Sequence, residues 1–334
     1  MVVFYHSDDD GKCAGYWAGK LNKRKTGVKD DAVNYIMINY GWPIPWDKIS
    51  KNELVYIVDF SFSVEDMNKL LELTPNVVWI DHHISAIEKY ADYDKHVDGI
   101  RLDGVAGCLL TYLYLTCFVD AEGHEDAALI ARFEEFISDV VPPFATSPQT
   151  NVMQYLVDMS DVVIPAFTLL IADWDIWEFE YGEMTKNFHI GFSMIPHRPQ
   201  DSIWDSLQLP SETSFSRCEP IIREGATARK YRNYWMKNYC ASVGFAAQFK
   251  DPSLQDYSCY AMNIAHISSD DFVIDSSPYD VLIGFSFDGD VWTYSLRSAR
   301  PAVDVSIIAK HFGGGGHKNA AGFVSKELHI EKKP

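Results

Sequence analysis

Three short apolar runs near the start of the chain each end on a polar residue that can bind a metal ion. "MVVFYH" ends at His6, "ELVYIVDF" reaches Asp59, and "VVWIDHH" ends in Asp81, His82 and His83. Short, continuously apolar runs of this kind are typical of strands buried on both faces of a parallel sheet. Because segments with helical periodicity separate the runs, the pattern predicts a doubly wound α/β domain. Ligands bind beyond the carboxyl ends of the strands in such sheets, where these acids and histidines would lie.

The rest of the chain predicts a second domain. Helical patterning runs through about residues 104–177, so we assign residues 1–200 to a first domain and 215–334 to a smaller α/β domain. In the first domain, Ser63 is a plausible N-cap for the helix that follows it. In the second, Asp288-Gly289 between alternating residues is a hairpin signal. Residues 120–165 and 189–210 match no motif, and we expect them to shape substrate choice.

The charge of the chain limits its partners. Among 334 residues, 47 acidic side chains outnumber 29 basic ones, for a formal net charge of −18. Binding of long nucleic acids depends on neutralising many phosphates, so we expect a short nucleotide substrate and no long duplex. The alternative is that the acidic surface serves solubility alone.

The cysteines and the apolar runs indicate the compartment. The six cysteines include no CxxC pair and no zinc-finger spacing, and we expect reduced thiols. No cleavable signal is evident, and the longest apolar run, "VVIPAFTLLIA", has about half of the ~20 residues needed to span a bilayer. We therefore expect a cytoplasmic protein with no membrane partner, and a homodimer stays open.

The first polar cluster has the pattern H-x-D-x-D, formed by His6, Asp8 and Asp10. Alternate residues of an extended segment project to the same side, so these three side chains can converge, although acidic loop tips are also common without a ligand. Asp59 follows a mostly aliphatic run, where an unpaired buried carboxylate would be costly. A metal ion would relieve that cost, and a cap on the next helix is the alternative.

Asp81-His82-His83 is the strongest of the motifs. Two adjacent imidazoles after a strand cannot both face one ion, so one would ligate while the other faces a substrate, and Asp81 could fix a tautomer. Asp173 is a further acid after an apolar run, with Asp175 two residues on, and either could instead cap a helix or form a salt bridge. Histidine and aspartate without cysteine favour Mn²⁺ or Mg²⁺, and a bridging carboxylate would make a two-metal site.

These residues resemble the DHH phosphoesterase superfamily, and in particular its nanoRNase and oligoribonuclease-like phosphodiesterases. The motifs that carry the resemblance are "HSDDDG", "VDF", "DHH", "IADWD", "LRS" and "FGGGGHKNAAGF". The resemblance implies two Mn²⁺ ions, with Mg²⁺ as the other candidate, a bridging and catalytic Asp59, and a water or hydroxide between the ions as nucleophile. The implied ligands are His6, Asp8, Asp59 and Asp173 for one ion and Asp10, Asp59 and His82 for the other. His83 would face the scissile phosphate, and an assignment shifted to Asp9 or Asp175 stays open.

The glycine run near the end of the chain is the candidate substrate-binding loop. It lacks the Gly-Lys-Ser/Thr of a P-loop and the third glycine of a dinucleotide fingerprint. What remains is either an ordinary glycine-rich turn or a nest of backbone N–H groups that holds a phosphate. With the resemblance, the second reading assigns substrate binding to Gly314, Gly315, Gly316, His317 and Arg297. The active site would then lie in the cleft between the two domains.

The expected activity is therefore that of a metal-dependent phosphodiesterase. It would act as an exonuclease on short oligonucleotides, or cleave small and even cyclic nucleotides, and release nucleoside monophosphates. Two alternatives remain: a phosphoanhydride hydrolase of the pyrophosphatase or exopolyphosphatase type, and a non-catalytic nucleotide-binding protein.

Overall fold

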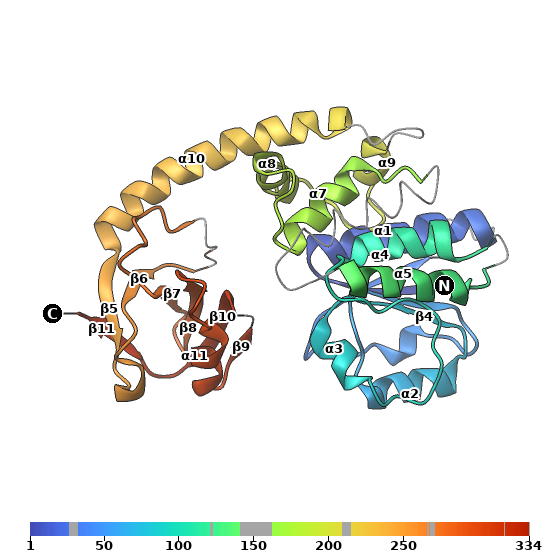
Figure 1. Ribbon diagram of the computed structural model, residues 1–334, viewed down its shortest axis with the longest axis horizontal. Coiled ribbons are helices and arrows are strands. Elements are labelled where there is room, and N and C mark those ends of the chain that lie inside the picture. The colour runs from blue at the N-terminus through green and yellow to red at the C-terminus, as the bar shows by residue number, and fades with distance from the viewer. Residues whose placement is uncertain are drawn as a thin grey trace. The chain divides into compact units, whose positions relative to one another are not determined.

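The computed structural model divides the chain into two units, Met1–Thr227 and Ala228–Pro334, called here the N-terminal and C-terminal units (Figure 1). It describes residues 1–26, 33–120, 123–140, 162–208, 215–265, 267, 271–316 and 318–333. His317 lies outside the described residues, as do residues 121–122 and 141–161 of the 120–165 segment.

A four-stranded parallel sheet forms the centre of the N-terminal unit, in the order β2-β1-β3-β4. The strands are β1 (Val2–His6), β2 (Asn34–Ile38), β3 (Val55–Val58) and β4 (Val77–Ile80). All residues of β3 and β4 are buried, as expected for strands covered on both faces. The parallel sheet predicted from the apolar runs is confirmed.

Helices cover both faces of this sheet, and alternate strand residues enter two separate cores. In β1, Val3 and Tyr5 pack into one core, whereas Val2 and Phe4 pack into the other. Figure 1 shows α1 and α4 on one side of the sheet and α2 and α3 on the other. The bounds are α1 (Asp9–Thr26), a 3₁₀ turn (Trp46–Lys48), α2 (Val64–Leu73), α3 (Ile84–Lys89) and α4 (Gly107–Leu113).

Further helices complete the N-terminal unit. They are a π-helical turn (Tyr114–Phe118), α5 (Ala127–Val140), α7 (Ala166–Asp175), α8 (Glu183–Ser193), α9 (Ile203–Leu207), a 3₁₀ turn (Phe215–Arg217) and the first part of α10 (Glu219–Val243). The predicted cap at Ser63 is confirmed, since its hydroxyl accepts the Asp66 N–H at 3.0 Å. Helix α2 therefore does not need Asp59 as its cap.

A seven-stranded mixed sheet forms the C-terminal unit, in the order β11-β5-β6-β7-β8-β10-β9, with β6 and β7 parallel. The predicted hairpin is confirmed: β7 and β8 are antiparallel, and Gly289 in their turn has φ +108°. The bounds are β5 (Phe245–Phe249), a 3₁₀ turn (Pro252–Leu254), β6 (Cys259–Asn263), β7 (Val281–Phe287), β8 (Trp292–Ser298), α11 (Val305–His311), β9 (Gly315–Gly316), β10 (Ala320–Ser325) and β11 (Ile330–Lys332).

The two sheets confirm the predicted fold class, a mostly parallel α/β unit followed by a smaller one with its own mixed sheet. The six cysteines are free thiols, as expected. Within the described ranges, no helix combines the length and the apolar character needed to cross a bilayer.

Candidate metal centre

The parallel arrangement of the strands brings their polar ends to one edge of the N-terminal sheet. His6 is the last residue of β1, Asp59 follows β3, and His82 lies two residues after β4. Asp59 has φ +54°, a left-handed conformation that is uncommon outside glycine and costs free energy. The backbone therefore departs from the strand path where it presents this carboxylate.

One group of possible metal ligands consists of His6, Asp8 and Asp59. His6 Nδ1 lies 2.6 Å from Asp8 Oδ2 and 3.6 Å from Asp59 Oδ2. The other oxygen of Asp8 accepts the Gly11 N–H at 2.9 Å, at the start of α1. This bond orients the carboxylate, so that the turn after β1 delivers the second member of the H-x-D-x-D pattern to the group.

A second group of possible ligands surrounds His82. Its Nε2 lies 3.1 Å from Asp59 Oδ1, 3.4 Å from Asp175 Oδ2 and 3.7 Å from Asp10 Oδ2. The Gly107 and Cys108 N–H groups, at the start of α4, donate to the two oxygens of Asp10 at 2.7 and 2.9 Å. Asp59 thus lies between the two groups, one oxygen toward His6 and the other toward His82.

The burial and the hydrogen bonding of Asp59 show whether these residues fit metal ions. It is 1% exposed, and among the described residues neither of its carboxylate oxygens has a hydrogen-bond partner. Burial and then the neighbouring carboxylates, above all Asp10 and Asp8, raise the pKa of Asp59 well above its ordinary value. Burial, followed by the charges of Asp10 and Asp8, does the same for the pKa of Asp175. Convergent acids with an orphaned central carboxylate need a compensating cation, so the donor set fits divalent metal ions.

The imidazole that contacts three acids is suited to ligation. Burial is the largest influence on His82 and lowers its pKa, which favours the neutral ring, the form that donates a lone pair to a metal ion. For His6, burial acts in the same direction, but the hydrogen bond and the charge of Asp8 outweigh it and raise the pKa.

The structure places Asp173 apart from the groups of possible metal ligands. Its carboxylate is fully buried, but it accepts the N–H groups of Glu180 at 2.7 Å and Tyr181 at 3.2 Å and a hydroxyl bond from Thr185. It therefore holds the turn between α7 and α8. Asp175 occupies the place beside His82 instead, because residues two apart on a helix point in different directions.

His83 belongs to a further group of possible metal ligands, with Asp59 and His82, and Asp81 orients its ring. Its Nδ1 lies 2.8 Å from Asp81 Oδ1, against 3.9 Å from Asp59 Oδ1. Asp81 is fully buried and also accepts the His82 N–H at 2.8 Å and a hydroxyl bond from Ser61. Burial alone would raise the pKa of Asp81, but the hydrogen bond and charge of His83 and the bond from Ser61 outweigh it, and the pKa is lowered. The aspartate of the triplet orients its neighbour, as a tautomer-fixing role requires.

Sequence reasoning missed the part played by Gly107. A Cβ at this position would lie 2.8 Å from Asp59 Cβ and Oδ1 and 3.0 Å from Asp10 Oδ2. Real Cβ atoms do not approach other atoms so closely, so only glycine lets α4 start against the two acids. The one signal in the sequence was Gly107 itself, the second glycine of "GVAGCLL", which stands directly before an apolar helical run.

Asp9 lies outside the two ligand groups. It accepts from His197 Nε2 at 2.8 Å and from Lys12 at 3.2 Å, with His189 Nδ1 at 3.4 Å. Burial opposes ionisation of Asp9, but the hydrogen bonds from His189 and His197 outweigh it and lower its pKa. The ring of His189 also stacks on Trp174 at 3.9 Å. Part of the 189–210 segment, which matched no motif, thereby packs directly behind the metal centre.

The predicted substrate loop lies in the C-terminal unit. Gly315 and Gly316 form β9 and pair with β10, whereas the Gly314 N–H donates to Ala309 O at the end of α11. A Cβ on Gly314 would meet Gly322 O at 2.2 Å, and one on Gly316 would meet Ala321 Cα at 2.5 Å. These two glycines are therefore required for packing inside the unit, whether or not the loop binds a phosphate.

The guanidinium of Arg297 donates to Leu296 O at 2.9 Å and to Ile267 O at 2.8 Å. His317 lies outside the described residues, so its place relative to the loop is not given. The substrate-binding roles of Arg297, His317 and the three glycines stay predictions.

The resemblance read from the motifs is confirmed at the level of the fold, because the chain superposes on the structure of a DHH domain. The DHH domain of a member of the s1p family of ribosomal proteins matches 97% of this chain and 82% of its own, with a TM-score of 0.52 and 13% identity.

Two other solved structures cover nearly the whole chain at lower structural similarity. RecJ from Thermus thermophilus, in complex with Mn²⁺, matches 96% of this chain and 49% of its own, with a TM-score of 0.45 and 15% identity. A pGpG-specific phosphodiesterase from Vibrio cholerae matches 98% of this chain and 93% of its own, with a TM-score of 0.39 and 12% identity.

Among curated proteins, an uncharacterised protein of Acanthamoeba polyphaga mimivirus is 55% identical over 185 residues. The match takes in 49% of this chain and 38% of that protein, so the chain spans well under half of this relative's length. No model of a known protein family matches the chain.

Proposed function

We propose that the protein is a metal-dependent phosphodiesterase that hydrolyses short oligonucleotides or small nucleotides, cyclic ones included, to nucleoside monophosphates. The observation that carries the proposal is the buried carboxylate of Asp59, which lacks hydrogen-bond partners among the described residues and lies between two groups of aspartates and histidines. The DHH-domain fold and the motifs in the sequence support the same reaction class.

The proposed ligands form two sets that share Asp59. His6, Asp8 and Asp59 would hold one cation, and Asp10, Asp59, His82 and Asp175 the other, with Mn²⁺ or Mg²⁺ as the oxygen- and nitrogen-binding ions that suit this set. Two such ions activate a water molecule and stabilise the charge of a phosphoryl transition state.

The chain's own residues would orient the reactants. Asp81 holds His83 through Nδ1, which leaves Nε2 of the ring for an oxygen of the scissile phosphate. Asp10 and Asp8 are each fixed by backbone N–H groups, so the ligand geometry is set before substrate arrives. Such preorganisation lowers the reorganisation needed at the transition state. The glycine run and Arg297 of the C-terminal unit remain the proposed contacts for a terminal phosphate.

Product analysis with a metal and with a chelator tests the proposal. The purified protein with Mn²⁺ is offered di- to pentanucleotides of RNA and DNA, cyclic dinucleotides, phosphoadenosine phosphate and polyphosphate. We expect nucleoside monophosphates from at least one of the nucleotides and none after chelation. Asp59→Asn should abolish turnover, whereas Asp92→Asn, at an exposed acid of the same unit, should leave it unchanged.

Two results contradict the proposal. Release of phosphate from polyphosphate without action on nucleotides would indicate a phosphoanhydride hydrolase. Recovery of intact, tightly bound nucleotide after long incubation would indicate a binding protein without catalysis.

A further inference from the structure

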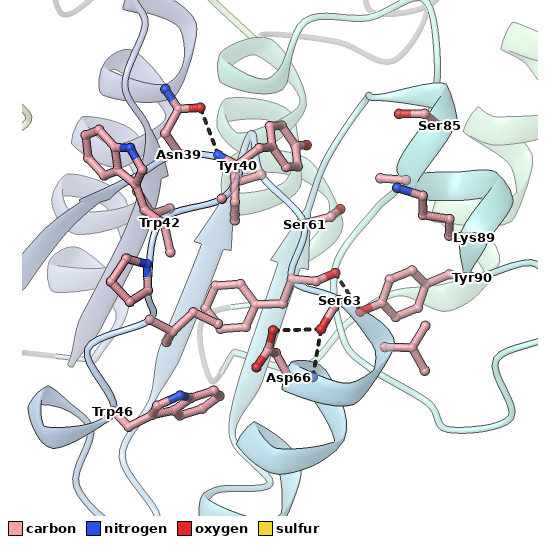
Figure 2. A pocket seen from close by; sticks show the side chains of 18 residues that line it. Asn39, Tyr40, Trp42, Trp46, Ser61, Ser63, Asp66, Ser85, Lys89 and Tyr90 are labelled. Atoms are coloured by element: carbon pink, nitrogen blue, oxygen red, sulfur yellow. Dashed lines mark hydrogen bonds between the residues drawn. The ribbon is translucent and has the colours of Figure 1, made fainter. Parts of the chain in front are cut away.

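A hollow of about 870 Å³ lies in the N-terminal unit beside the metal centre. Its walls come from the segment after β2, the segment between β3 and α2, and helix α3. Figure 2 shows Tyr40 and Trp42 along one side of the pocket and Ser85 and Lys89 along the other. None of the motifs in the sequence falls on the residues after β2, so nothing in the proposed chemistry accounts for this pocket.

Two aromatic rings are left open to solvent in this pocket. Tyr40 is 51% exposed and Trp42 is 50% exposed, although burial of such side chains would be favourable. Trp46, on the same wall, is covered instead by the ammonium of Lys69, 4.1 Å from its ring centre. Exposed aromatic rings that line a concave surface mark a binding site more often than a solitary exposed residue does.

The pocket adjoins the metal centre through Tyr40. The ring of Tyr40 lies 6.0 Å from that of His6 and 6.1 Å from that of His83, centre to centre. Ser61 lines the pocket, and its hydroxyl donates to Asp81, which holds His83. A flat ligand stacked on Tyr40 would therefore be separated from His6 and His83 by the Tyr40 ring alone.

The charge of the chain favours a stacked base over further phosphate contacts. With a net charge of −18, the protein gains little from general attraction to polyanions. Stacking of a neutral base on an aromatic side chain needs no positive charge, and every nucleobase offers a π face. Lys89 adds one ammonium to the lining of the pocket.

We propose that this pocket is a nucleobase subsite, in which Tyr40 and Trp42 stack the base of a nucleotide whose phosphodiester bond lies at the metal centre. The inference deepens the proposed function, on which it rests, because it names a base-bearing nucleotide rather than a bare polyphosphate as substrate. It also assigns base recognition to the catalytic unit itself.

The test compares the binding of adenosine monophosphate and ribose 5-phosphate, which differ by the base alone, to the full chain in Mn²⁺ by calorimetry. We expect the nucleotide to bind at least 10-fold more tightly. Trp42→Leu, and more so its combination with Tyr40→Leu, should remove that preference while ribose 5-phosphate and Mn²⁺ bind as before. Trp42→Phe keeps a ring that can stack on the base, so this variant should retain most of the preference for adenosine monophosphate. Tyr231→Leu, at a tyrosine of α10 that is 70% exposed, should have no effect.

Equal affinity for the two ligands, or a preference that survives both leucine substitutions, would overturn the subsite. If Trp42→Leu instead converts a dimer to a monomer in light scattering with unchanged nucleotide affinity, the pocket is an interface between copies and the inference is wrong.

Turnover of a dinucleotide separates this inference from the proposed function. Normal cleavage with a KM that Trp42→Leu does not change would leave the phosphodiesterase standing and remove the subsite. Base-dependent binding that Trp42→Leu abolishes, in a protein that cleaves no nucleotide, would keep the subsite and remove the phosphodiesterase.

Discussion

Asp173 and Asp175 stand two positions apart on α7, and their carboxylates serve different ends. A helix turns by about 200° over two residues, so two such side chains cannot reach the same ion. Asp173 is fully buried and accepts two N–H bonds from the turn that follows and a hydroxyl bond from Thr185 of α8. Asp175 Oδ2 lies 3.4 Å from His82 Nε2. Motif position alone does not separate these two acids, whereas hydrogen bonding does.

The two aspartates form a matched pair of variants. Asp175→Asn should weaken Mn²⁺ binding at least 10-fold, because a charged ligand is replaced by a neutral amide. Asp173→Asn should leave Mn²⁺ affinity within about 3-fold but lower the free energy of unfolding by about 1–3 kcal/mol, the cost of unsatisfied buried partners. Calorimetric metal titration and urea denaturation measure the two effects. The opposite order of metal affinities would return Asp173 to the ligand set.

Helix α4 and strand β3 meet at the metal centre with almost no space between them. The first N–H groups of α4 hold Asp10, and Gly107 lets the helix approach Asp59. The buried ring of Trp17, whose indole N–H donates to Thr168 at 3.0 Å, packs α1 against α7 behind this contact. The position of a whole helix thus sets the distance between two acids that are 49 positions apart in the chain.

Gly107→Ala tests this contact between the elements. The added methyl group would lie 2.8 Å from Asp59, so either the helix or the carboxylate must move. We expect at least a 10-fold loss of activity and a loss of about 1–3 kcal/mol in the free energy of unfolding, typical of overpacking. Wild-type activity in Gly107→Ala would show that the approach of α4 does not set the site.

At the scale of the whole molecule, the clustered carboxylates of the metal centre affect the stability of the folded state. Without a cation, the raised pKa of Asp59 makes its ionisation unfavourable in the folded state. Below the ordinary aspartate pKa of about 3.9, the Asp59 carboxyl is protonated in the folded and in the unfolded state, so it does not change the free energy of unfolding. As the pH rises, the unfolded chain ionises first, so stability falls until the pH passes the raised pKa.

We therefore expect the chelated protein to lose stability at Asp59 as the pH rises above about 4. Asp8 and Asp81, whose pKa values are lowered, act in the opposite direction, so the comparison that isolates the effect is wild type against Asp59→Asn. The variant should be more stable at pH 7 by about 1–3 kcal/mol when chelated. Saturating Mn²⁺ should stabilise the wild type by about 2.7 kcal/mol at 100 times Kd and the variant far less. Urea denaturation at several pH values, with Mn²⁺ or chelator, gives both numbers, and a chelated wild type more stable than Asp59→Asn at pH 7 would contradict the expectation.

The sequence by itself determined the parallel sheet and most of its polar edge. A short strand that is apolar throughout needs both of its faces covered, as in a parallel sheet between two layers of helices. The carboxyl ends of parallel strands then meet at the same edge of the sheet. His6, Asp59 and His82 were therefore predictable as neighbours, and the turn signals at Ser63 and Asp288-Gly289 were local enough to be read directly.

Only the tertiary structure decided the contacts between distant segments. Whether Asp173 or Asp175 reaches His82 depends on the rotation of α7, and the role of Gly107 depends on how closely α4 approaches β3. The aromatic wall of Tyr40 and Trp42 has no motif, and it becomes a candidate site because the fold places it beside His6 and His83. Local sequence sets strand ends and caps through short-range sterics and hydrogen bonds, whereas packing sets which side chains face each other across elements.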